Sequence, residues 1–241
     1  MNHTRQRRLV AGLIVMIIGM ILVLQNPANY QALPADEVVH DTELPPASSL
    51  GLGEARSVLD ELDIKGRAPK TGYARSNFGT GWARDGSCDM RNLVLGRDMQ
   101  DVVWDDRCRV LSGTLEDPYT AQTIQFVRGS ESSQLVQIDH VVSLSDAWQK
   151  GAQALAQTER VKLSNDPLNL LAVDGASNQQ KGDGDAATWL PPNRLFRCQY
   201  VARQIAVKQK YNLWLTAAEY EAMVRVLERC PGQLLPVAQP S

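Results

Sequence analysis

The sequence predicts an α+β domain that follows a hydrophobic N-terminal helix. Three observations support this fold class: an uncharged apolar run at 9–24, alternating polar and apolar residues around a turn signal at 116–119, and several segments with apolar residues at helical spacing. The 241 residues, 44% of them hydrophobic, suffice for one globular domain with accessory segments. The expected parts are a signal peptide or membrane anchor (1–24), a flexible linker (25–49), a domain (50–232) and a tail (233–241).

The charge of the chain restricts how it could meet nucleic acid. Its formal net charge is -2 and its pI is about 5.9. The overall electrostatic field therefore does not attract polyanions as that of a strongly basic protein does. Any contact with nucleic acid must rest on a local basic patch.

The N-terminal run, LVAGLIVMIIGMILVL, follows Arg5, Arg7 and Arg8. It is shorter than the about 20 residues of a membrane-spanning helix and longer than most signal-peptide cores of about 7–15 residues. No clean small-x-small cleavage site follows, which favours an anchor with the arginines in the cytoplasm; a cleaved export signal is the alternative. Both interpretations place the domain outside the cytoplasm, after a proline-punctuated, acidic linker that should be extended.

Helices should open the domain. Apolar residues at helical spacing predict a helix over 54–64, with Gly66 as its stop, and a second helix is expected over 92–99. Between them lies a segment rich in glycine and aromatic residues. Its aromatic side chains are expected to be packing residues: Tyr73, Phe78 and Trp82.

Strands should follow these helices. Residues 109–115 and 123–127 alternate polar and apolar residues on either side of the turn signal Glu-Asp-Pro-Tyr at 116–119. They predict a hairpin. A further short strand is expected at 135–139.

The segment 136–185 contains the residues most suited to chemistry. A β-branched run ends in the pair Asp139-His140, and the capping-box spacing of Ser143 and Asp146 predicts a helix that continues through 147–155. A second strand is expected at 168–173, followed by a helix that begins at Ala176 or Ser177. The order is strand, helical spacer, strand, helix.

Two helices should complete the domain, over 194–211 and 216–230, the second opened by a capping box at Thr216 and Glu219. No acidic residue occurs between Ala186 and Ala218. The first helix supplies the local basic patch that the net charge requires, although a solvated helix face is an equal alternative. Its basic residues are Arg194, Arg197, Arg203, Lys208 and Lys210.

The four cysteines are Cys88, Cys108, Cys198 and Cys230. An even number of cysteines in a domain outside the cytoplasm predicts two disulfides, with three possible connectivities. We favour the pairs Cys88–Cys108 and Cys198–Cys230, because each closes a modest loop. A Cys₄ zinc site is a weak alternative, since no C-x₂-C spacing occurs.

Three stretches carry a resemblance to a known family: IDHVV at 138–142, NLLAVDGASNQQK at 169–181 and, more diffusely, WLPP at 189–192. The chain resembles the HNH endonuclease superfamily, and within it the branch related to the C-terminal domain of GmrSD restriction enzymes. The resemblance covers about 70–232. It implies a ββα-metal core (HNH or His-Me finger) at 136–185, in which two antiparallel strands and a helix surround one divalent metal.

The resemblance also implies roles for single residues. His140 matches the general base, Asp139 and Asn178 match metal ligands, and Asn169 matches an asparagine that braces the loop beneath the base. Lys181 would face the scissile phosphate. Because carboxylate and amide oxygens prefer hard ions, we expect one Mg²⁺ or Mn²⁺ rather than Zn²⁺.

Adjacent residues on a regular strand point to opposite faces, so Asp139 and His140 can share a site only if the strand ends or bends there. Asp183 and Asp185 could extend the metal shell, although acids in such Gly-Asp-Gly-Asp runs are more often loop and cap residues. His3 and His40 lie outside the domain.

The sequence therefore predicts an exported or membrane-tethered endonuclease that hydrolyses nucleic-acid phosphodiesters, DNA rather than RNA. Low specificity is expected because no sequence-reading module is evident. One alternative is a non-catalytic cell-envelope or nucleic-acid-binding module with the same fold. Another is a hydrolase of a different phosphodiester, such as a cell-wall polymer or lipid. The sequence identifies no immunity or inhibitor protein.

Overall fold

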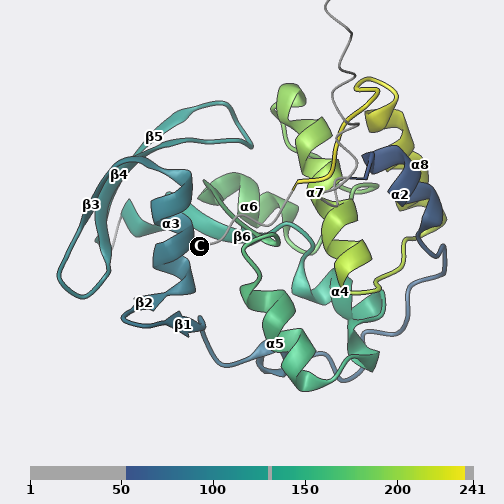
Figure 1. Cartoon of the computed structure of the whole chain (residues 1–241), viewed down its shortest axis with the longest axis horizontal. Helices are drawn as coiled ribbons and strands as arrows, with labels where there is room; N and C mark the ends of the chain where they lie inside the picture. The colour runs from purple at the N-terminus through teal and green to yellow at the C-terminus, as the bar shows by residue number, and fades with distance from the viewer. Residues whose placement is uncertain (1–52, 130–131, 237–241) are drawn as a thin grey trace, which may run out of the picture. The chain divides into compact units, whose positions relative to one another are not determined.

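The computed structural model describes residues 53–129 and 132–236 (Figure 1). The predicted N-terminal helix, the whole predicted linker and the last tail residues lie outside this part. Within the described ranges, no helix has the length and apolar character needed to cross a bilayer.

Seven α-helices and seven strands are found in the described residues. The helices are α2 (Ala55–Glu61), α3 (Met90–Asp98), α4 (Leu144–Gln149), α5 (Gln157–Asn165), α6 (Gly175–Lys181), α7 (Arg197–Lys210) and α8 (Ala217–Leu227). The strands are β1 (Arg84–Asp85), β2 (Cys88–Asp89), β3 (Gln100–Trp104), β4 (Val110–Glu116), β5 (Thr123–Val127), β6 (Val136–His140) and β7 (Leu170–Asp174). Short 3₁₀ helices lie at η2 (Arg75–Phe78), η3 (Ser132–Gln134), η4 (Ala152–Ala154) and η5 (Arg194–Phe196).

The mixed α+β class is confirmed, with strands in three small antiparallel sheets. The predicted hairpin is β4–β5, in register from Ser112↔Val127 to Glu116↔Thr123. Strand β3, which was not predicted, pairs with the other edge of β4 with two register shifts. The third pair, β6–β7, runs from Val136↔Asp174 to His140↔Leu170.

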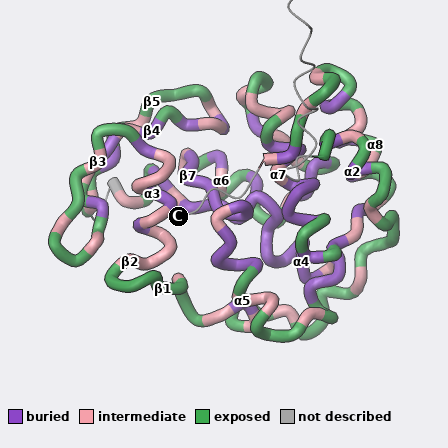
Figure 2. The backbone as a smooth tube through the Cα atoms, in the orientation of Figure 1, coloured by how far each residue is buried: buried purple, intermediate pink, exposed green. Residues whose placement is uncertain are grey.

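Two apolar cores flank the β6–β7 pair. Helix α7 is the centre of the first, and packs with α2 and α8 on one side of the molecule (Figure 1). Helix α3 covers the second, between the three-stranded sheet and β6–β7. Figure 2 shows that the buried residues are concentrated along the central strands and α7. The β6–β7 pair is therefore held on both sides.

The helical spacer between the two central strands differs from the prediction. Helix α4 begins as expected, because the Ser143 hydroxyl accepts a hydrogen bond from the Asp146 amide (3.3 Å). It ends at Gln149, whereas the prediction had it continue to residue 155. Gly151 has φ 121°, and a Cβ there would lie 3.2 Å from the ring of Trp214. The chain therefore turns at this glycine, and α5 starts separately.

Residues 233–236, which belong to the predicted tail, pack against the start of the domain. The Ala55 amide donates to the carbonyl of Gln233 (2.8 Å), and the Leu235 amide donates to that of Gly53 (3.1 Å). Leu235 is buried in the first core. This segment therefore contributes an apolar side chain to the first core.

Both disulfides join the favoured pairs. Cys88–Cys108 links β2 to the turn before β4, with a Cα–Cα distance of 5.1 Å. Cys198–Cys230 links the start of α7 to the segment after α8, with a Cα–Cα distance of 6.4 Å. No described cysteine is free.

Buried charges join the helices beneath the first core. The Lys150 ammonium lies 2.7 Å from Asp146, 2.8 Å from Asp185 and 2.6 Å from Glu219. Formal charges in this group balance. We call it the buried ion cluster; its members are Arg67, Asp146, Lys150, Asp185, Lys208 and Glu219.

Candidate active site

The pair β6–β7 and helix α6 form one consecutive unit that carries most of the predicted site. Helix α6 begins at Gly175, earlier than expected, because the Asp174 carboxylate accepts a hydrogen bond from the Ser177 amide (2.7 Å). A Cβ at Gly175 would come within 2.1 Å of the Gln134 carbonyl oxygen. Glycine is therefore required where the helix leaves β7.

Strand β6 ends at His140, as a site shared by Asp139 and His140 requires. Beyond it, the Val141 amide donates to the backbone carbonyl of Asn169 (2.8 Å) and the Val142 amide donates to the Asn169 side chain (2.8 Å). The Asn169 amide group also donates to the carbonyls of Val142 (3.2 Å) and Leu163 (3.3 Å). Asn169 is fully buried. It fixes the bend that follows the Asp-His pair.

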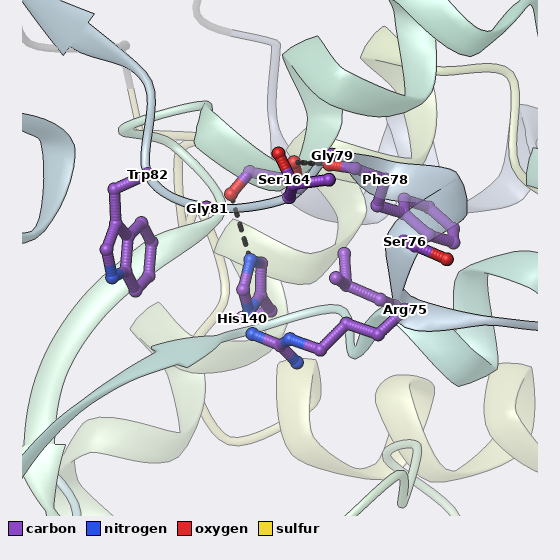
Figure 3. Close-up of a pocket in the computed structure, with 10 residues that line it drawn as sticks. Arg75, Ser76, Phe78, Gly79, Gly81, Trp82, His140 and Ser164 are labelled. Carbon is purple, nitrogen blue, oxygen red and sulfur yellow. Dashed lines mark hydrogen bonds between the residues drawn. The ribbon is translucent and has the colours of Figure 1, made fainter.

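Two adjoining cavities form a cleft on this unit, with volumes of about 350 and 480 Å³. Arg75, Trp82, His140 and Leu144 line both of them. Figure 3 shows the first cavity, with Arg75 and Trp82 on either side of His140. Asp139 and Asn178 line the second, so three predicted site residues border one cleft.

His140 is held in one orientation and one tautomer. Its Nε2 lies 2.9 Å from the Ser164 carbonyl oxygen. Because a carbonyl can only accept, Nε2 carries the proton and Nδ1 keeps a lone pair. The imidazole is stacked with the Trp82 ring, at an interplanar angle of 5° and 6.0 Å between centroids.

Burial lowers the pKa of His140 to about 4, and the charges of Arg75 and Lys181 act in the same direction against the Ser164 hydrogen bond. The imidazole is therefore neutral near pH 7. A neutral imidazole with a free Nδ1 can accept a proton from water.

Asp139 is buried between two donors. The Lys181 ammonium lies 2.8 Å from its Oδ1, and the Tyr119 hydroxyl donates to its Oδ2. Burial, and next the Asp139 charge, raise the pKa of Tyr119 well above its usual value, so the hydroxyl keeps its proton. Each carboxylate oxygen retains a lone pair beyond these bonds.

Lys181 was expected to face the scissile phosphate, but in the structure it forms an ion pair with Asp139. Its side chain is fully buried, and the ammonium also donates to the His140 carbonyl (2.8 Å). Lys181 lines neither cavity of the cleft, and its contact with a phosphate stays a prediction. It neutralises Asp139 and ties α6 to the end of β6.

Asn178 and Asp183 provide oxygen atoms at the second cavity. The Asn178 amide group donates to Gln137 Oε1 (2.9 Å), which leaves its carbonyl oxygen as an acceptor. Asp183 accepts from Lys70 (3.0 Å) and Ser145 (2.9 Å), and these bonds, that of Lys70 first, lower its pKa. Asp185 belongs to the buried ion cluster and lies away from the cleft, because Lys150 and Arg67 hold its carboxylate.

The oxygen atoms of Asp139 and Asn178 are of the kind that a hard divalent ion prefers. Among the described residues, no group of three or more His, Cys, Asp or Glu could hold a metal. Asp139 and Asn178 offer one carboxylate and one amide oxygen on the same cavity. Mg²⁺ usually keeps several waters and takes few protein ligands, so such a pair suits it better than Zn²⁺.

Three residues at this site were missed from the sequence. Arg75 lies in the 3₁₀ helix η2, where no periodic pattern marks a function. Trp82 was interpreted as a packing residue, and Tyr119 only as part of a turn. The Glu-Asp-Pro-Tyr turn was the one available signal, because its tyrosine lies in the loop that connects β4 to β5.

The predicted basic face of α7 is divided. Arg203 donates to the carbonyls of Leu168 and Leu170 (both 3.2 Å), and Lys208 is fully buried in the ion cluster. Lys208 is thus closed off from solvent, and the prediction that it contacts nucleic acid is wrong; Arg203 is only half-buried, and its contact stays a prediction. Arg194 and Arg197 are accessible and line a separate cavity of about 290 Å³.

An Asp-His pair at the end of one of two antiparallel strands, with a helix after them and a polar cleft beside them, is compatible with a nuclease-like α+β domain. Residues 91–226 match the family described as GmrSD restriction endonucleases, C-terminal domain, and the chain belongs to this family. It is also 34% identical over 216 residues to an "Uncharacterized secreted protein" of Arthroderma benhamiae, covering 89% of this chain and 97% of that protein. No solved structure shows a significant match.

Proposed function

We propose that this protein is an HNH-type, metal-dependent endonuclease that hydrolyses nucleic-acid phosphodiesters, DNA rather than RNA, with low sequence specificity. The observation that carries the proposal is the convergence of His140, Asp139 and Asn178 on one cleft from β6 and α6. Membership in a family of restriction endonuclease domains supports it. In this proposal, β6, β7 and α6 constitute the ββα-metal core.

His140 is the general base. Its Nδ1 accepts a proton from the attacking water while the Ser164 carbonyl holds the ring through Nε2. A bond forms between the water oxygen and phosphorus as the bond to the 3′ oxygen breaks. The products carry a 5′-phosphate and a 3′-hydroxyl.

Asp139 and Asn178 would hold one Mg²⁺ or Mn²⁺. When bound, the ion neutralises a non-bridging oxygen and stabilises the departing 3′ oxygen. Lys181 and Tyr119 are positioning residues, since they fix the Asp139 carboxylate from behind. Arg75 faces the cleft beside His140 and supplies a cation there (Figure 3).

The test is nicking of supercoiled plasmid by the full-length protein, purified in mild detergent under oxidising conditions, with Mg²⁺, Mn²⁺ or EDTA. Loss of a general base typically costs about 10²–10⁴ in rate, and we expect this for His140→Ala. His40→Ala is the matched control, because His40 lies outside the predicted domain. Undiminished metal-dependent nicking by His140→Ala would refute the mechanism.

A second candidate is a non-catalytic nucleic-acid-binding module. The buried Lys181–Asp139 ion pair favours it, because the ammonium already neutralises the predicted ligand. This function requires DNA binding that is unchanged by metal and no turnover of any substrate. A panel of plasmid, RNA and a synthetic phosphodiester, run with both metals, separates the two and also tests for another phosphodiester.

We also propose an extracytoplasmic location. The similar protein of Arthroderma benhamiae is described as secreted, and two disulfides suit an oxidising compartment. Fractionation of cells that express the full chain tests this location. Recovery of reduced, cytoplasmic protein alone would contradict it.

A further inference from the structure

Four arginines meet at a cavity away from the candidate catalytic residues. The cavity has a volume of about 290 Å³ and lies between the start of α7 and the end of α8. Its charged lining residues are all basic: Arg194, Arg197, Arg225 and Arg229. The remaining lining consists of alanine, leucine, valine and Cys198. We call this site the arginine pocket.

The positive charge of the arginine pocket is largely uncompensated. Arg225 lies 3.8 Å from Glu221, whereas Arg194, Arg197 and Arg229 form no ion pair with a described residue. Glu228, which directly precedes Arg229, lines a different cavity, and Asp185 directs its carboxylate to Lys150 and Arg67 in the buried ion cluster.

The charges also act on one another. Partial burial, then the charges of Arg194 and Arg229, lower the pKa of Arg197. Its guanidinium is fixed by a hydrogen bond from Nε to the Pro191 carbonyl (2.8 Å). Like charges gathered without carboxylates destabilise the free protein, and a bound anion would relieve this repulsion.

A disulfide brings two of these arginines together. Arg197 directly precedes Cys198, and Arg229 directly precedes Cys230. The bond between the two cysteines holds their Cα atoms 6.4 Å apart, so the two arginines are anchored at adjacent points of different helical segments. The other disulfide lacks this pattern, because only Cys108 follows an arginine, Arg107, while Cys88 follows Ser87.

We infer that the arginine pocket binds a backbone phosphate of the nucleic-acid substrate, at a distance along the strand from the bond that is cut. Guanidinium groups bind phosphate oxygens in a bidentate manner and read no sequence. The inference rests on the proposed function for its ligand. The pocket is small and lacks aromatic side chains, so it suits a phosphate and not a base.

The test measures binding of a fluorescent DNA duplex by the full-length protein in EDTA, over a series of salt concentrations. The variant is Arg194→Gln/Arg229→Gln. Each phosphate contact contributes about 0.9 to the slope of log K against log salt, so loss of the single phosphate in the pocket should make the slope about 0.9 less steep. Extrapolated from 1 M salt, this is roughly an 8-fold loss of affinity at 0.1 M.

The matched control is Lys65→Gln/Arg107→Gln. It removes the same charge from exposed positions that line neither the cleft nor the arginine pocket, and Arg107 also precedes a disulfide cysteine. We expect its salt slope to remain that of the wild type. Equal slopes for the two double variants would overturn the inference.

A further arm identifies the source of the phosphate. The protein is floated with vesicles of phosphatidylglycerol and phosphatidylcholine. If flotation depends on Arg194 and Arg229 while the salt slope of DNA binding is unchanged, the arginine pocket belongs to a lipid surface and the inference is overturned. Because EDTA prevents turnover, failure of plasmid nicking would refute the nuclease without affecting this result. Unchanged slopes with intact nicking would refute only the arginine pocket.

Discussion

Replacement of Lys181 by methionine tests the organisation of the candidate site most directly. Lys181→Met keeps the apolar stem but removes the ammonium that lies 2.8 Å from Asp139 and 2.8 Å from the His140 carbonyl. The carboxylate is 5% exposed and would lose its only charged partner among the described residues. Breaking a buried ion pair in this way typically costs about 3–5 kcal/mol.

The assay is equilibrium unfolding in guanidinium chloride, with EDTA present and the disulfides intact. Lys162→Met is the matched control: its ammonium lies 2.8 Å from Glu159, but both side chains are exposed. Pairs of that kind contribute about 0–1 kcal/mol. The double variant Asp139→Asn/Lys181→Met should be destabilised by less than the sum of the single variants, with a coupling of about 1–3 kcal/mol.

Metal provides a second readout of the same variant. If Asp139 is a ligand, its unpaired carboxylate should bind Mg²⁺ more tightly, so Mg²⁺ should restore part of the stability of Lys181→Met. The Asp139→Asn double variant should not respond. A cost of Lys181→Met no larger than that of Lys162→Met, or additive costs in the double variant, would refute the reasoning.

Three further predictions concern stability and activity. In EDTA, protonation of His140 should favour unfolding, because its pKa is about 4 in the folded protein and its ordinary value is 6.5. The stability contributed by the neutral imidazole should be fully present above pH 6.5 and should fall by about 3 kcal/mol towards pH 4. In a series of denaturation curves at different pH values, His140→Asn should remove this component. Asn169→Ala should cost about 2–4 kcal/mol in thermal unfolding, because it leaves the buried Val142 amide without its acceptor, and a cost below 1 kcal/mol would contradict a bracing role. Cys198→Ala/Cys230→Ala should lower stability by about 2–4 kcal/mol in chemical denaturation, whereas equal midpoints for wild type and variant would show that the bond is dispensable for folding.

Local patterns predicted the elements that present the candidate site. The Asp139-His140 pair closes a β-branched strand, and the Glu-Asp-Pro-Tyr turn separates two alternating segments, so each signal lies within a few residues of the element it predicts. Cysteine spacing was equally informative, since the favoured pairs close short loops. Strand β3 was missed because its pairing with β4 is irregular and Asp101 has a positive φ of 51°.

The direction of charged side chains could not be predicted in the same way. Arg203 and Lys208 look like members of a solvated basic face, yet carbonyls of the 167–170 segment and the carboxylate of Glu219 satisfy them inside the protein. Lys181 is likewise satisfied by Asp139, a residue far away in the sequence. The partners that make such burial favourable are brought together only by tertiary packing.

The pairing of Gly53–Ala55 with Gln233–Leu235 means that the described domain is closed by its own two ends. A pulling force on the chain ahead of Gly53 would act on these backbone hydrogen bonds first. Strands β6 and β7 and helix α6 are not part of this pairing, so the force would reach them later. Adjacent termini also favour circular permutation. A permuted chain with new ends in the exposed β1–β2 turn at 86–87 should keep the cleft, although it would lose this mechanical shielding.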